Sequence, residues 1–186
     1  FRRLERFVFL LKSLLTPRQF IYFSCVLVGL SSALAVIILK TFAHWVYKSA
    51  QRLDDIFHLP YSNSTLPIIG IIITVIIVKK VLDGSIEKGT SQIMYAVAKK
   101  RGIMPRKQMF AQIITSSFTV GMGGSAGLES PITITGAAFG SNYAQNYRLS
   151  YKDRTLLLAC GVAAGIGAAF NAPIAGVLFA IEVVLA

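Results

Sequence analysis

Charged side chains are scarce in this sequence, and acidic ones are scarcer still. Only 15% of the 186 residues are charged, and the 8 acidic residues are outnumbered by 19 lysines and arginines. A soluble domain has about 25% charged residues. With 54% hydrophobic residues, the composition excludes an ordinary soluble domain and indicates a chain that lies in a lipid bilayer. The basic residues flank apolar segments, which is typical of the cytoplasmic edges of membrane helices and not of a nucleic-acid-binding face.

Cysteine and histidine are nearly absent as well. Cys25 and Cys160 lie in separate apolar stretches far apart in the sequence, so their spacing predicts neither a disulfide framework nor a metal site. We expect two separate, buried thiols that behave as small hydrophobic residues. The two histidines, His44 and His58, show no metal-ligand spacing either. The sequence therefore predicts no metal and no cofactor.

The apolar segments predict an all-α fold, a polytopic bundle of membrane helices. Residues 1–18 mix basic and apolar side chains and predict an amphipathic helix on the cytoplasmic membrane surface, and residues 19–186 form the transmembrane part. The stretch 19–39 can cross a hydrocarbon core of about 30 Å, residues 44–61 resemble an interfacial segment, and 66–78 leads back to a lysine-rich region. Both basic regions, and with them the N-terminus, are therefore expected in the cytoplasm.

Beyond Lys107 the apolar pieces become short, because glycine, proline or asparagine interrupts them. Each is shorter than the ~20 residues of a full span: 109–120, 131–141, 155–170 and 172 onward. Backbone that breaks at membrane depth is tolerated only where it is buried in protein or lines a cavity. Such interrupted segments point to the binding site of a transporter. We therefore predict broken half-helices that meet around a site.

Two glycine pairs at four-residue spacing support dense packing in this region. Gly136 and Gly140 form the first pair, and Gly161 and Gly165 form the second. Small residues at this spacing let the backbones of two membrane helices approach closely. They predict helix contacts and indicate nothing about a ligand.

Glu129 is the only charged residue between Lys107 and Arg148, in the stretch GMGGSAGLESPITITG. Pro131 fits the first position of a helix, which would place Glu129 just before a helix N-terminus. The free N–H groups of such an end, together with flexible glycines upstream, form a ready anion site. A charged residue in mid-membrane costs about 2.5–3.5 kcal/mol, more than packing alone would justify. The pattern favours a function for Glu129 as an anion gate or a proton carrier.

Two segments carry a resemblance to a known family. GGSAGLESPITITGAAFGS, followed by GVAAGIGAAFNAPIAGVLFAIE, resembles the CLC family of chloride channels and anion/proton antiporters. The resemblance implies a homodimer in which each subunit has its own anion pathway and consists of two inverted-topology repeats. This chain would be a fragment that covers most of the first repeat. Chloride is then the bound substrate, Glu129 the gating glutamate, and Gly127, Leu128 and Ser130 the backbone that flanks the anion.

The chain departs from the pattern of that family at three places. Leu128 replaces an arginine or lysine, and Ser130 replaces a glycine. The Gly-Ser-Gly-Ile-Pro motif is degenerate, so either Thr90 or Ser91 could supply the hydroxyl that contacts the central anion. Val183 stands where many antiporters of the family carry a proton-accepting glutamate. This favours passive conduction through a channel, with a proton-coupled antiporter as the alternative.

Other classes of function fit less well. Residues 123–127 match Gly-x-Ser-x-Gly, so an intramembrane serine hydrolase that uses Ser125 is a remote alternative. However, both histidines precede this serine, and no strand pattern leads into it. A purely structural membrane protein leaves Glu129 unexplained, and a cation carrier would need more acidic residues along its path. We therefore expect transport of a small anion, and no enzyme.

Overall fold

The computed structural model describes residues 16–57, 62–81 and 89–185, and in these parts of the chain every regular element is a helix. The predicted all-α fold is therefore confirmed. Nearly all of the predicted surface helix at 1–18 lies outside the described residues. The elements are α2 (Pro17–Phe57), α3 (Ser62–Val81), α4 (Ser91–Lys99), α5 (Gln108–Gly121), α6 (Glu129–Asn146), α7 (Tyr151–Phe170), α8 (Pro173–Ala180) and a π-helical segment, η1 (Ile181–Leu185).

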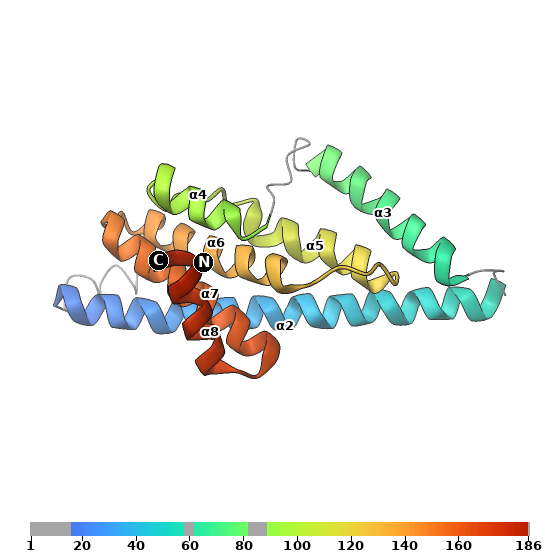
Figure 1. The fold of residues 1–186 in the computed structure, drawn as a ribbon, viewed down its shortest axis with the longest axis horizontal. Helices are drawn as coiled ribbons and strands as arrows, with labels where there is room; N and C mark the ends of the chain where they lie inside the picture. Colours follow the sequence, from blue (N-terminus) through green and yellow to red (C-terminus); the bar gives the residue numbers. More distant parts are fainter. Residues whose placement is uncertain (1–15, 58–61, 82–88, 186) are drawn as a thin grey trace.

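Helix α2 runs along the whole molecule, and α5, α6 and α7 pack along it (Figure 1). It contains the predicted first span but continues to Phe57, so residues 44–57 of the predicted interfacial segment belong to the same helix. The reason is that neither glycine nor proline occurs between Gly29 and Pro60, and nothing else interrupts the helix. Its outer face exposes Tyr22, Val26 and other large apolar residues, a surface suited to lipid.

Two helices of the described residues are long and apolar enough to cross a membrane, within Pro17–Leu53 and at Tyr151–Phe170. The second corrects a prediction, because the piece at 155–170 was expected to be a half-helix. The Ser150 hydroxyl accepts a hydrogen bond from the Asp153 N–H, and this N-cap starts α7 at Tyr151. Helices α5, with 14 residues, and α8, with 8, remain shorter than a full span, as predicted.

The predicted glycine contacts lie between α6 and α7. A Cβ atom on Gly136 would stand 2.4 Å from the Gly161 carbonyl oxygen, and one on Gly161 would stand 2.1 Å from the Gly136 carbonyl oxygen. A Cβ on Gly140 would likewise meet the Leu157 carbonyl oxygen at 2.2 Å. The Ser32 hydroxyl of α2 donates a hydrogen bond to the Gly161 carbonyl oxygen at 2.7 Å. Three helices therefore meet at one point through backbone and small side chains.

Replacing Gly161 by alanine should destabilise the protein, because the new Cβ would overlap the backbone of α6. Overpacking of this kind costs about 1–3 kcal/mol or more. The measurement is thermal unfolding of the full-length protein in detergent. G29A is the matched control, since a Cβ on Gly29 would meet only Ala164 Cβ, at an ordinary 3.6 Å. A G161A variant as stable as G29A would contradict the close contact.

Candidate functional site

The candidate site is built around the first turn of α6. This helix begins at Glu129 with Leu128 as its N-cap, two positions before the start that Pro131 predicted. Glu129 is therefore the first residue of the helix and not the residue before it. No side chain caps this end. Because the first N–H groups of a helix have no intrahelical acceptor, the donors of Leu128, Glu129 and Ser130 are available to an anion.

The Glu129 side chain is exposed and has no hydrogen-bond or ion-pair partner among the described residues. The backbone of Glu129 does form a hydrogen bond: the Thr133 hydroxyl donates to its carbonyl oxygen at 2.6 Å. A carboxylate at a helix N-terminus is favoured by the helix dipole. The side chain is thus next to an anion-binding helix end and is free to turn toward it or away.

The glycine-rich loop before α6 has two different parts. Gly121 and Gly124 are needed for packing, because added Cβ atoms would stand 2.7 Å from Val46 Cβ and 2.5 Å from the Thr119 carbonyl oxygen. Gly123 has φ of 89°, which favours glycine. Around Gly127, by contrast, nothing lies within 4 Å of the position of an added Cβ. Among these glycines, Gly127 is the one that leaves open space beside the helix end.

The first turn of α4 lies beside this end of α6. Gly89, with φ of 66°, turns the chain into α4, and a Cβ on it would stand 3.9 Å from the Ser130 hydroxyl oxygen. Thr90 is the N-cap of α4 and is half-buried, and Ser91 is exposed at the first helical position. The Thr90 hydroxyl does not cap its own helix. The structure therefore brings the start of α4, which carries both candidate hydroxyls, close to the first turn of α6, although the two segments lie far apart in the sequence.

The break between α7 and α8 falls between the predicted apolar pieces 155–170 and 172 onward. Asn171 has left-handed backbone with φ of 53°, and Pro173 starts α8. Helix α8 folds back onto α7, because a Cβ on Gly176 would stand 2.5 Å from the Ala163 carbonyl oxygen. The Lys40 ammonium group of α2 donates to the Ala169 carbonyl oxygen in the last turn of α7. A cation at a helix C-terminus is favourable, and no sequence pattern indicated this contact.

Two further residues complete the surroundings of α4. Val183 of η1 packs against the cluster that contains Ile93 and Ala96 of α4, whereas Glu182 is exposed. Gln92, next to the candidate hydroxyls, is only 8% exposed, and its side-chain oxygen has no partner in the described parts of the chain. The sequence gave no reason to select Gln92, because a glutamine in a helical segment has no distinctive pattern.

Other sequence candidates lie elsewhere. Ser125 is in the loop between α5 and α6, so Gly-x-Ser-x-Gly is not at the strand-to-helix turn that a nucleophile elbow requires.

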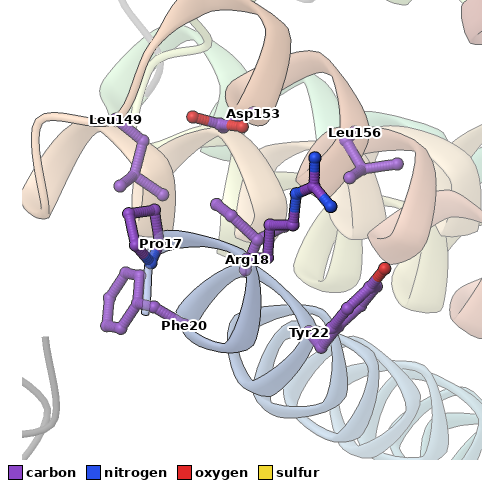
Figure 2. A pocket seen from close by; sticks show the side chains of 8 residues that line it. Pro17, Arg18, Phe20, Tyr22, Leu149, Asp153 and Leu156 are labelled. Carbon is purple, nitrogen blue, oxygen red and sulfur yellow. The ribbon is translucent and has the colours of Figure 1, made fainter. Parts of the chain in front are cut away.

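A cavity of about 450 Å³ lies at the opposite end of α6, between the first turns of α2 and α7 (Figure 2). Arg18 and Asp153 are the charged residues that line it. This cavity is not part of the site around Glu129.

The fold and the site define a polytopic helical membrane protein with broken helices beside a carboxylate that has no partner among the described residues. The family model described as "Voltage gated chloride channel" matches residues 69–186. This match covers more than half of the sequence, and the chain belongs to that family. No solved structure gave a significant match to the chain.

Several curated proteins are similar to the chain. A "Putative chloride channel protein ClcB-like" of Ralstonia nicotianae is 38% identical over 52% of this chain and 24% of its own length. "Chloride channel protein CLC-c" of Arabidopsis thaliana is 40% identical over 43% of this chain and 12% of its own length. An "H(+)/Cl(-) exchange transporter ClcA" of Salmonella paratyphi A is 30% identical over 90% of this chain and 36% of its own length. The chain thus spans at most about a third of the length of these relatives.

Proposed function

We propose that this chain forms part of a pathway that conducts chloride or a similar small anion across a membrane, with Glu129 as its gate. The observation that carries the proposal is the juxtaposition of two helix N-termini, those of α4 and α6, beside a carboxylate with no partner in the part of the chain that the structure describes. Each helix N-terminus carries roughly half a positive charge and free N–H donors. Two such ends together favour a desolvated anion where no arginine or lysine side chain is needed.

In this proposal, backbone N–H groups from Gly127 to Ser130 and a hydroxyl from Thr90 or Ser91 hold the anion. The Glu129 carboxylate occupies the same end of α6 in the closed state. Protonation removes its charge, or a chloride ion displaces it, and the side chain swings out into the space beside Gly127. Leu128 contributes its backbone only, because its side chain packs against the cluster of Val36 and Leu39. The absence of a basic side chain at 128 leaves the helix ends as the main source of positive potential.

The proposal favours passive conduction over proton exchange. Val183 packs beside α4, at the place where a proton-accepting glutamate would be needed, and valine carries no proton. The names of the relatives include both chloride channels and H⁺/Cl⁻ exchange transporters, so proton-coupled antiport through another route is the alternative. We also propose a homodimer with one pathway per subunit, and a cytoplasmic N-terminus, since basic residues concentrate before α2 and between α3 and α5.

Replacing Glu129 by alanine should open the pathway and remove the dependence of anion flux on pH. In the wild type we expect flux to rise as the pH falls, by at most about tenfold per pH unit, the limit for one titrating proton. The measurement is chloride efflux from liposomes that contain the full-length protein. E182Q is the matched control, because it neutralises another exposed acidic residue, in η1, and should keep the pH response. A pH response in E129A as steep as that of wild type would contradict the gate.

A reversal-potential measurement separates the two modes of transport. Liposomes with the full-length protein would carry a chloride gradient and a known pH gradient. We expect the reversal potential to follow the chloride gradient alone, because Val183 cannot relay a proton. A potential displaced by the pH gradient would establish antiport instead. No anion-dependent potential at all would overturn the proposed function.

The two hydroxyl candidates can be separated by isosteric replacement. If Thr90 contacts the anion, T90V should weaken chloride binding about tenfold to a hundredfold, because a hydrogen bond to a charged group contributes about 1.5–3 kcal/mol. S91A should then change binding less than about threefold, and the reverse pattern would assign the contact to Ser91. Calorimetric titration of the purified full-length protein with chloride measures both. Unchanged binding in T90V, S91A and the double variant would exclude a hydroxyl ligand.

A further inference from the structure

The interface between α2 and α7 contains a seam of small residues that includes both cysteines. Gly29 of α2 faces Ala164 of α7, because a Cβ atom on Gly29 would stand 3.6 Å from Ala164 Cβ. The two helices run in the same direction: Ser32 donates to the Gly161 carbonyl oxygen, and Lys40, further along α2, donates to the carbonyl oxygen of Ala169, further along α7. Residues further along α2 therefore contact residues further along α7, as in a parallel helix pair.

The periodicity of the helix places the two thiols opposite each other on this seam. Cys25 precedes Gly29 by four residues, and Cys160 precedes Ala164 by four residues. Residues four apart lie on the same face of a helix, one turn from each other. The cysteine pair therefore occupies the next position along the seam, and the two thiol groups interact directly. The sequence prediction of two separate thiols is corrected by this packing.

The dimensions of the seam fit a disulfide bond. In disulfides the Cβ–Cβ distance is about 3.5–4.5 Å, with a mean near 3.8 Å. At the Gly29/Ala164 position, one turn away, a Cβ added to Gly29 would stand 3.6 Å from Ala164 Cβ, a distance within that range. Both cysteines are free and half-buried, so neither residue is fully enclosed by the core. Cys25 also packs beside Val28 and Leu157, which hold this part of the seam together.

We propose that Cys25 and Cys160 are a modification site, at which a hydroperoxide oxidises the pair to a reversible disulfide that joins α2 to α7. The sulfur of one thiol attacks the outer oxygen of the hydroperoxide, the O–O bond breaks, and an alcohol leaves. The sulfur of the second thiol then attacks the resulting sulfenic acid, the S–S bond forms, and the S–O bond breaks with release of water. Both sulfur atoms are oxidised, the peroxide is reduced, and a dithiol reductant reverses the change.

The experiment uses the full-length protein in liposomes, with every other cysteine replaced by alanine. The protein is treated with tert-butyl hydroperoxide, free thiols are blocked with N-ethylmaleimide, and the digest is examined by mass spectrometry. We expect maleimide labelling to fall from two thiols to none per chain. A peptide pair linked through Cys25 and Cys160 should appear at the same time. Dithiothreitol added before the maleimide should restore both labels and remove the linked pair.

Two matched variants test the geometry. On a C25S/C160S background, the pair G29C/A164C lies on the same seam and should cross-link as well. In C25S/V26C, the thiol moves to Val26, which is 61% exposed on the outer face of α2, and no link to Cys160 should form. The proposal is overturned if G29C/A164C links and the native pair does not. It is also overturned if Cys25 links only to Cys25 of a second copy, or if V26C links to Cys160 as readily as Cys25 does.

Discussion

The contact on which the rest of the structure depends is the one between the backbones of α6 and α7. At Gly136 and Gly161 each carbonyl oxygen occupies the place where the other residue would carry a Cβ atom. In a bilayer there is no hydrophobic force between helices, so close packing and interhelical hydrogen bonds must hold them together. The Ser32 hydroxyl adds such a bond at the same point. This contact fixes the axis of α6, and with it the direction in which the Glu129 end of the helix faces.

The sequence predicted those features that depend on neighbouring residues. The glycine spacing, the short helices α5 and α8, and the break after Asn171 all follow from local backbone preferences, and the structure has each of them. The continuation of α2 to Phe57 was not predicted. The polar and aromatic residues after His44 are typical of a membrane–water interface, but they are equally compatible with a helix. Helix α7 begins at Tyr151, four residues before the predicted apolar piece at 155–170. Its N-cap, Ser150, lies outside that piece, so the apolar pattern did not indicate it.

Only part of the candidate site could be predicted from the sequence. Glu129 stands out in the sequence, because a lone carboxylate among glycines and apolar residues is costly in a membrane. The approach of Gly89 to Ser130 is a tertiary contact, and nothing near either residue encodes it. The same holds for Cys25 and Cys160, which only the parallel packing of α2 and α7 brings together. No side chain caps the N-terminal end of α4 or of α6, which is consistent with a site for a ligand at these ends.

The length of α2 separates its middle, beside the site, from both of its ends. It has 41 residues and is therefore about 60 Å long, against a hydrocarbon core of about 30 Å. A helix longer than the core is accommodated by tilting or kinking, or by local thickening of the bilayer. Leu128 packs on Val36 and Leu39, at the middle of α2. The N-terminal end of α6 therefore lies beside the middle of α2, about 30 Å of helix from each of its ends.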